Sequence, residues 1–408
     1  MLKRFFANYQ LIRPYNRSLP RQPQCGIGNI WITLASLILI AASPLLAAHS
    51  QEDSGVVISL RTYGWEPQRG NIRTPSIIID HKNRVVVGFT VEERRGLVDR
   101  NQPSLGFHVL RFSGVGKADL SLSVPTNKRG RTDVQLSDQD QIIVRANDNL
   151  QLLQVGEGTV QNAIWKILAP CPIQCGDVQS QTRRTLVLYT EQADPVTVIR
   201  LSPEPQVERC GKERSLLKSI GDKLQNWPTS ITDSYAYSHG EESDSGLQRW
   251  PLCDYEHRIE LPLRAVAWTA LSDNVFLVRT YENRKGHWGL ELVAPDGLVK
   301  FRVPLLKHES AGTPSTPTRS SERGDRIAVD VLTLQGGNRT FDISSHITSR
   351  RIAVYDTDAG KQVASIPVSI RYHYGFAFAF SPDGRRLAIL EDDVVRIVDL
   401  APAKSDMH

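Results

Sequence analysis

The chain lacks the short motifs of the common catalytic machineries. It contains no Gly-x-Ser-x-Gly nucleophile elbow, no His-Glu-x-x-His metal motif, no phosphate-binding P-loop and no Gly-x-Gly-x-x-Gly after a strand. Each of these motifs places a reactive group or a phosphate cradle at a fixed spacing. Because none is present, we expect no catalytic residue and no cofactor.

Acidic residues are missing from the first fifty positions, which carry Lys3, Arg4, Arg13, Arg17 and Arg21. An apolar run of about 17 residues at 30–46 follows, and then small residues; this is the pattern of a signal peptide cleaved near Ala48 or Ser50. The same run is long enough to remain as a membrane anchor with its positive flank inside. We favour cleavage. In both cases we expect export, with a periplasmic or secreted protein as the first choice and a membrane-anchored one as the alternative.

Beyond that segment the chain has no charge imbalance, because its five basic residues account for the whole formal net charge of +5. It also has no basic stripe with interleaved aromatic residues, so we expect no nucleic-acid partner. Membrane contact is expected only through the N-terminal segment if that segment stays uncleaved. The partner that we expect is a protein or a glycan, and we expect the chain to be a monomer.

Cysteine is scarce, with five residues in all, of which Cys25 lies in the targeting segment. An even number of the remaining cysteines in an exported chain favours disulfides. Of the three possible connectivities we favour Cys171 with Cys175 across a short loop and Cys210 with Cys253 around a long insert. Paired Cys-x-x-Cys motifs are absent, which disfavours the alternative of a zinc site. Free thiols are the other alternative.

What the chain does contain is a rhythm of short apolar runs separated by Gly, Pro, Asp, Asn and Ser, which predicts strands and turns. In groups of four strands the runs form about seven units, at residues 75–125, 127–170, 178–204, 228–263, 265–305, 316–369 and 372–400. The last unit is one strand short. Residues 55–63 can supply that strand and so close a ring, which removes exposed sheet edges.

Two motifs near the C-terminal end carry a resemblance to known families. FSPDGRRLAIL at 380–390, followed by VVRIVDL at 394–400, resembles the blades of WD40-like and TolB-type (PD40) β-propeller repeats of exported bacterial proteins. VYDTDAGKQVASI at 354–366 resembles the turn of YVTN and quinoprotein-like blades. WD40 blades have a Trp-Asp pair where this chain has Val398 and Asp399. The resemblance implies an all-β propeller fold. With the units counted above, we expect a single β-propeller of about seven four-stranded blades, and six blades are the second choice because the pattern is poorly resolved at 178–263.

The turn residues of these motifs have a structural explanation. Pro382 presets φ for a tight turn, Asp383 accepts hydrogen bonds from the turn backbone, and Gly384 takes a positive φ. Asp356 and Gly360 are expected to close another hairpin in the same way. We therefore assign all five residues to blade turns.

The expected domain organisation is a targeting or anchor segment at 1–50, a propeller at 51–401 and a disordered tail at 402–408. The one helical pattern lies near 212–227, where apolar residues recur every three to four positions. We interpret it as an insert on the propeller edge, tethered by the cysteines on either side. A docking helix for a partner is the alternative.

Two clusters are candidate sites. Tyr372, His373 and Tyr374 precede an inner strand, where propellers line their central funnel, so they are candidates for ligand contact. The stretch CDYEHRIE groups acidic residues around His257 and could supply metal ligands or an acid/base pair. In a strand, however, Asp254 and Glu256 would face away from His257, which favours a solvated strand edge.

These observations favour a non-enzymatic binding or interaction scaffold whose ligand is unknown. The alternative is a propeller enzyme, either a quinoprotein-like dehydrogenase or a carbohydrate-active enzyme, with its site in the central funnel. If three or more titratable groups converge in the funnel, the enzyme is favoured. An apolar or scattered lining favours the scaffold.

Overall fold

The computed structural model describes residues 56–65, 75–93, 104–114, 116–126, 132–146, 148–155, 163–171, 175–190, 196–210, 229–239, 246–263, 267–282, 287–311, 318–335, 347–370 and 376–401. The chain divides into Met1–Gln51 and Glu52–His408, and all described residues belong to the second unit. The expected segments at 1–50, 212–227 and 402–408 lie outside the described residues. Within the described ranges, no helix is long and apolar enough to cross a membrane.

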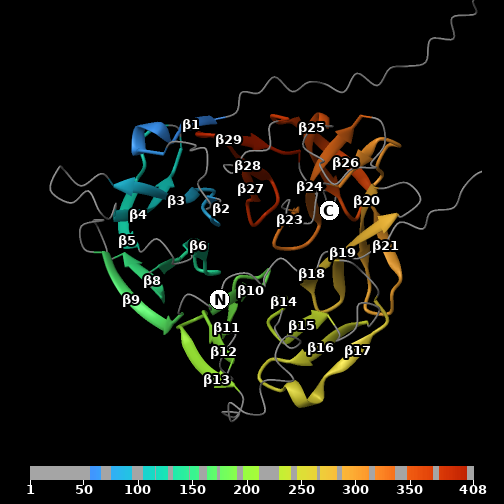
Figure 1. Ribbon diagram of the computed structural model, residues 1–408, viewed down its shortest axis with the longest axis horizontal. Helices are drawn as coiled ribbons and strands as arrows, with labels where there is room; N and C mark the ends of the chain where they lie inside the picture. Colours follow the sequence, from blue (N-terminus) through green and yellow to red (C-terminus); the bar gives the residue numbers. More distant parts are fainter. Residues whose placement is uncertain are drawn as a thin grey trace, which may run out of the picture. The chain divides into compact units, whose positions relative to one another are not determined.

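The described strands form seven antiparallel sheets around a common centre (Figure 1). This arrangement is a seven-bladed β-propeller and confirms the expected fold class. We number the blades along the chain: blade 1 is β2–β5, blade 2 is β6–β9, blade 3 is β10–β13, blade 4 is β14–β17, blade 5 is β18–β21, blade 6 is β22–β26, and blade 7 is β27–β29 with β1.

Each blade has one inner strand beside the centre of the ring. The inner strands are β2 (Ser76–Ile79), β6 (Asp133–Leu136), β10 (Cys175–Gln179), β14 (Ser230–Ile231), β18 (Ala267–Ser272), β23 (Thr318–Ser320) and β27 (Ala377–Phe380). Several adjacent inner strands are in contact: β2 lies against β6 and β27, β14 lies against β10 and β18, and β23 lies against β27. Side chains of these strands therefore surround the central channel.

Three further strands follow outward in each blade. The second strands are β3 (Val85–Glu93), β7 (Ile142–Ala146), β11 (Thr185–Thr190), β15 (Tyr235–His239), β19 (Val275–Glu282), β24 (Arg326–Leu334) and β28 (Arg386–Glu391). The third strands are β4 (Ser104–Phe112), β8 (Asn149–Val155), β12 (Val196–Arg200), β16 (Leu247–Pro251), β20 (His287–Val293), β25 (Ile347–Asp356) and β29 (Val394–Asp399).

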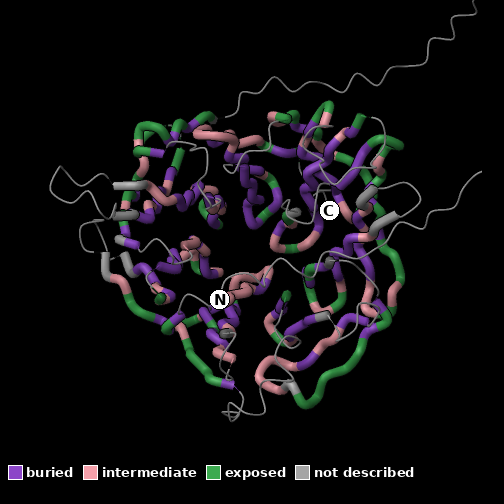
Figure 2. Tube along the Cα trace, in the orientation of Figure 1, coloured by how far each residue is buried: buried purple, intermediate pink, exposed green. Residues whose placement is uncertain are grey.

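The outer strands are β5 (Leu120–Thr126), β9 (Ala163–Pro170), β13 (Gln206–Cys210), β17 (Ile259–Leu261), β21 (Val299–Arg302), β26 (Lys361–Pro367) and β1 (Val56–Ser59). Blade 6 has one extra strand, β22 (Glu309–Ser310), which pairs with β24 beyond the end of β23. Figure 2 shows the consequence for burial: the middle strands are buried, whereas much of the outer strands is exposed.

The ring is closed by β1, which pairs antiparallel with β29 as the outer strand of blade 7. This confirms that an N-terminal strand completes the last unit. The strand is shorter than the predicted range 55–63, however, because Arg61–Tyr63 forms one turn of 3-10 helix, η1. Gly64 ends that turn with a φ of 83°. Trp65 then packs back on blade 7, where its Nε1 donates to the carbonyl of Asp392 at 2.8 Å.

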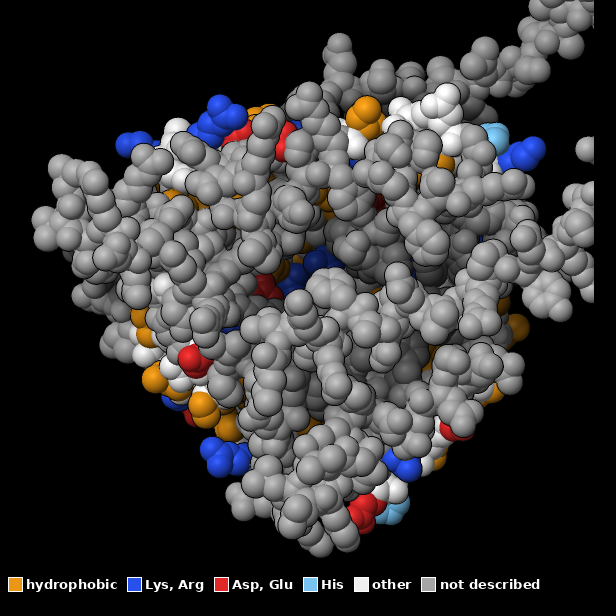
Figure 3. All heavy atoms as spheres, in the orientation of Figure 1, with side chains coloured by type: hydrophobic (Ala, Val, Ile, Leu, Met, Phe, Trp, Pro, Cys, Tyr) orange, Lys and Arg blue, Asp and Glu red, His pale blue; other side chains and the backbone are white. Residues whose placement is uncertain are grey.

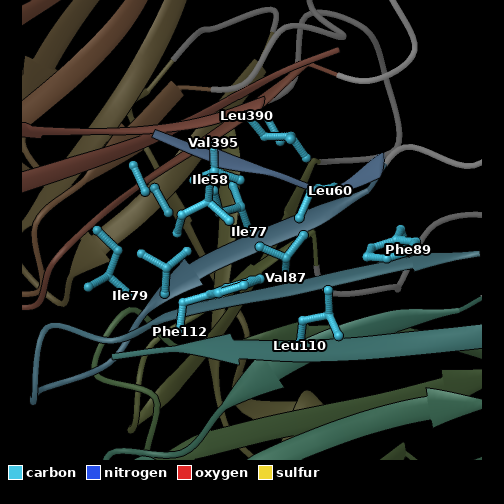
Figure 4. Close-up of a cluster of buried hydrophobic side chains, with 14 of the residues drawn as sticks. Ile58, Leu60, Ile77, Ile79, Val87, Phe89, Leu110, Phe112, Leu390 and Val395 are labelled. Atoms are coloured by element: carbon cyan, nitrogen blue, oxygen red, sulfur yellow. The ribbon is translucent and has the colours of Figure 1, made fainter. Parts of the chain in front are cut away.

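The core consists of apolar clusters between neighbouring blades. Figure 4 shows the cluster between blades 7 and 1, where β1 and β27–β29 of blade 7 meet β2–β4 of blade 1. Its labelled members include Ile58, Ile79, Val87 and Phe112, all buried. Similar clusters lie between the other blades. Because the sheets are covered on both faces, middle strands such as β7 and β24 are buried along all or nearly all of their length.

The predicted units correspond to the seven blades, but two of them have different bounds. In blade 6, β22 lies before the predicted start at residue 316. In blade 3, β10 begins at Cys175 and not at residue 178. There the predicted unit ended at residue 204, whereas the outer strand β13 spans Gln206–Cys210. Four of its five residues are exposed and only Cys210 is buried. The sequence of this strand therefore contains no apolar run from which it could be predicted.

Both favoured disulfides are present. Cys171 is bonded to Cys175, with 5.2 Å between their Cα atoms, and Cys210 to Cys253, with 4.7 Å. The first closes the connection between blades 2 and 3. The second joins the outer strand of blade 3 to the turn after β16 in blade 4, and so tethers the ends of the segment between them.

Candidate functional site

The inner hairpins of all seven blades are built alike. Each turn between the first and second strand begins with a residue that has a side-chain oxygen: Asp80, Ser137, Ser180, Thr232, Ser272, Ser321 and Ser381. In each blade that oxygen accepts a hydrogen bond from a later backbone N–H of the same hairpin. Such side-chain acceptors fix tight turns. This recurring residue is the repeat signal that the sequence contained and that we did not recognise.

The turn of blade 7 contains the Pro-Asp-Gly motif. Gly384 has a φ of 68°, and its N–H donates to the carbonyl of Ser381 at 2.9 Å. Oδ1 of Asp383 accepts from the N–H of Arg385 at 3.0 Å. In the outer hairpin of blade 6, Oδ1 of Asp356 accepts from the N–H of Ala359 at 2.7 Å, and Gly360 has a φ of 62°. These contacts lie within the turns and are of the kind that fixes tight backbone geometry.

Several inner turns meet across the centre of the ring. His81 of blade 1 has Nδ1 2.9 Å from Oδ1 of Asp140 in blade 2 and Nε2 3.1 Å from Oε2 of Glu322 in blade 6. The backbone N–H of His81 also donates to the same Asp140 oxygen at 2.8 Å. A neutral imidazole has one N–H and can donate to one carboxylate, whereas the imidazolium donates to both.

Two side chains of the inner turn of blade 3, Gln181 and Arg183, also extend to other blades at the centre of the ring. Nη1 of Arg183 donates to the carbonyl of Ile79 in blade 1 at 3.0 Å. Nε2 of Gln181 donates to the carbonyl of Ser320 in blade 6 at 3.2 Å. Burial lowers the pKa of Arg183, and the charges of Glu322, Asp140 and Asp80 oppose that change. We call His81, Asp140, Gln181, Arg183 and Glu322 the turn plug, because they connect four blades at one end of the channel.

A further arginine lies inside the channel. Arg319 occupies the middle of the inner strand β23, and its side chain is exposed to solvent. Burial among the surrounding blades nevertheless lowers its pKa, and the charge of Asp133 on β6 of blade 2 opposes that change. A side chain that is accessible to water but surrounded by protein is what a channel produces. Blades 2 and 6 are not neighbours, so this charge interaction acts across the channel.

Figure 3 agrees with this arrangement. The ring is hollowed at its centre, and both basic and acidic side chains are visible within the hollow. Asp133 itself is held in place, because Oδ1 accepts from the N–H of Val134 at 2.9 Å and from the hydroxyl of Ser76. The channel therefore has a fixed carboxylate on one side and an arginine on the other.

Two buried ion pairs join strands of the propeller, one between neighbouring blades and one within a blade. Nη1 of Arg145 in blade 2 contacts Oδ1 of Asp177 in blade 3, and both side chains are buried. In blade 6, Nη2 of Arg350 lies 2.8 Å from Oδ2 of Asp330, and the guanidinium stacks over the ring of Phe376 with 3.9 Å to its centroid. Buried pairs of this kind fix the packing of neighbouring elements and are costly to break.

The residues proposed for ligand contact, Tyr372, His373 and Tyr374, lie outside the described residues. The predicted strand around CDYEHRIE is wrong in its first part, because Tyr255–His257 forms one turn of 3-10 helix, η3, and β17 begins only at Ile259. As a result His257 and Asp254 are together, with Nδ1 2.6 Å from Oδ2. Glu260 points elsewhere and accepts from the N–H of Gly246 at 2.7 Å.

Among the described residues, one set of three potential metal ligands lies close together: Glu208, Cys210 and Cys253. Both sulfur atoms are already joined in a disulfide. A metal needs deprotonated thiolates, so this set does not fit one while the bond is intact.

The chain matches no protein-family model and none of the curated proteins. Among solved structures it is similar to a chain of a mitotic checkpoint complex, with 14% identity over 90% of this chain and 99% of the other and a TM-score of 0.45. It is also similar to the WD40 domain of Toxoplasma gondii coronin, with 11% identity, coverage of 86% and 88% and a TM-score of 0.46. An oligogalacturonate lyase from Vibrio parahaemolyticus has 10% identity, coverage of 85% and 98% and a TM-score of 0.44. At these identities and scores none of the three bears on function.

Proposed function

We propose that the protein is an exported binding module that takes its ligand into the central channel. The observation that supports this most is the turn plug, which connects blades across one end of the ring. His81 is engaged with two carboxylates, and Arg183 with a backbone carbonyl. These groups hold the blades in fixed positions around the channel, and preorganisation of that kind lowers the cost of binding.

Export is part of the same proposal. Both cysteine pairs are positioned as disulfides, and such bonds persist in oxidising compartments outside the cytoplasm. Together with the basic and apolar N-terminal segment, they support a periplasmic or secreted protein. The partner that we propose is a protein or a glycan, bound by a monomer without nucleic acid.

A propeller enzyme is the second candidate. Its support is the number of ionisable groups at the centre, since Asp80, His81, Asp140, Arg183 and Glu322 all lie there. Such convergence is what we expected of an enzyme and not of a scaffold. Against it, both ring nitrogens of His81 lie within hydrogen-bond distance of a carboxylate, Asp140 or Glu322, so the imidazole is already engaged within the plug.

One experiment separates the two candidates. The purified full chain is incubated with a panel of oligosaccharides, peptides and small organic anions, and its thermal unfolding is followed together with the mass of every panel member. A binding module raises its Tm with some members and leaves all of them unchanged, because ligand binding stabilises the folded state. Turnover of any member contradicts the proposal and supports the enzyme.

A further inference from the structure

The inner strand β23 carries a positively charged side chain, that of Arg319, which is exposed to solvent. The exposed side chain of Arg319 lies on an inner strand, and the strand's outer edge is already paired with β24. Its neighbour Ser320 is fixed by Gln181 of blade 3, which reaches its carbonyl at 3.2 Å. The backbone that carries Arg319 is therefore held by β24 of its own blade and by Gln181 of blade 3.

We propose that Arg319 recognises an anionic group, a carboxylate or a phosphate, of a ligand that enters the central channel. A guanidinium presents paired N–H donors in a plane that matches the two oxygens of either group. This inference rests on the proposed binding function and names the chemistry of its ligand.

The surroundings of Arg319 strengthen such an interaction. Burial among the surrounding blades lowers the pKa of Arg319, and an ion pair partly surrounded by protein is screened less by water than one on an open surface. An anion beside Arg319 replaces part of the solvation that the surrounding protein removes. The other charge that acts on this arginine is Asp133, on the far side of the channel.

Asp133 limits which anions are accepted. Its carboxylate is fixed by Ser76 and by the N–H of Val134, so it cannot turn away from a ligand. It repels a second negative charge placed deep in the channel. The arrangement thus favours a ligand with a single anionic end toward β23 and a neutral or cationic part toward β6.

The test measures binding of inorganic phosphate and, in a separate arm, of acetate to the full chain by calorimetry at low ionic strength, with chloride as the control for salt. We expect at least one of the two anions to bind, and the tighter arm identifies the chemistry of the ligand. Arg319→Gln should weaken that binding about tenfold or more, since it removes a charge-assisted contact. Arg209→Gln is the matched control, because Arg209 is exposed on the outer strand β13, and it should change nothing.

The substitution Asp133→Asn should change anion binding in the opposite direction from Arg319→Gln. Asparagine keeps the side-chain oxygen that accepts from Ser76 and Val134 but removes the charge, so anion binding should become about threefold tighter at low salt. A purely structural role for Arg319 predicts no such gain. If the arginine variant fails to fold, phenylglyoxal modification of the wild-type chain replaces it: the anion should slow modification of Arg319, read by peptide mass, and not that of Arg209.

The proposal is overturned if neither anion binds, or if binding is the same in the Arg319 and Arg209 variants. With either result, the proposed binding function is still supported if a neutral oligosaccharide or peptide of the ligand panel raises the Tm. Conversely, turnover of a panel member contradicts the binding module even if the anion contact at Arg319 is real.

Discussion

Nε2 of His81 in blade 1 lies 3.1 Å from Oε2 of Glu322 in blade 6, although blade 7 separates the two blades in the ring. The contact therefore links two blades that are not neighbours in the ring. His81→Asn and Glu322→Gln should each lower the stability of the propeller. A double-mutant cycle should give a coupling of about 0.5–1 kcal/mol for the two partly exposed side chains.

The control for this cycle is a pair of the same chemistry within one turn. Nδ1 of His257 lies 2.6 Å from Oδ2 of Asp254, and both side chains are largely exposed. His257→Asn with Asp254→Asn should show a coupling near zero, measured by thermal or urea unfolding. Equal coupling in the two pairs contradicts a role of the plug in holding the ring together.

Closure of the ring depends on the buried face of β1. Ile58 is 3% exposed and packs in the core between blades 7 and 1, whereas Val57 on the same strand is 54% exposed. Ile58→Ala should lower the free energy of unfolding by about 2–5 kcal/mol, because it leaves a cavity in a packed core. Val57→Ala should cost less than about 0.5 kcal/mol. Urea unfolding of the two variants makes the comparison, and similar losses contradict the closure by β1.

The two disulfides should differ in what they contribute. Cys171 and Cys175 are 4 residues apart and Cys210 and Cys253 are 43 apart, so chain-entropy estimates are about 2 and about 4 kcal/mol. Cys210→Ser with Cys253→Ser should therefore lower the Tm more than Cys171→Ser with Cys175→Ser. Intact mass after alkylation, with and without reductant, verifies the pairing first. Four thiols that react without reductant contradict it.

Tyr237 should limit stability in alkali. The side chain is 0% exposed, and burial raises its pKa from 10.0 to about 12. The unfolded chain ionises near pH 10, so the contribution of this group is complete below that pH and is lost as the pH rises toward 12. The loss amounts to about 2–3 kcal/mol.

Tyr237→Phe tests this directly. The hydroxyl is buried without a well-formed hydrogen bond, so its removal should cost little at pH 8. Between pH 9.5 and 11.5 the variant should lose less stability than the wild type, measured by urea unfolding at each pH. Parallel loss in both proteins assigns the alkaline effect to other groups.

The architecture was accessible from the sequence because its determinants are local. Each blade is a set of apolar runs, and each turn has residues such as Pro382 and Gly384 that are suited to tight backbone geometry. Blade 3 was the least well defined, since β13 is mostly exposed and carries no apolar run. The pairing of β1 with β29 followed from counting, because one unit was a strand short.

The contacts at the centre of the ring could not be predicted from the sequence in the same way. His81 and Glu322 are 241 positions apart, and nothing near either residue distinguishes it from any other polar turn residue. Their contact depends on how many blades the ring has and how they tilt, which no local pattern specifies. The recurring Asp, Ser or Thr at the start of each inner turn would have located the plug, because it marks the end of the channel in every blade.

The strand order of blade 7 has a consequence for biosynthesis. β1 (Val56–Ser59) is translated long before β29 (Val394–Asp399), the strand with which it pairs. At about 5–20 residues per second, β1 waits roughly tens of seconds for its partner. During that time Ile58 cannot pack against the strands of blade 7 that cover it in the folded protein. The finished ring therefore forms only after translation of its last blade.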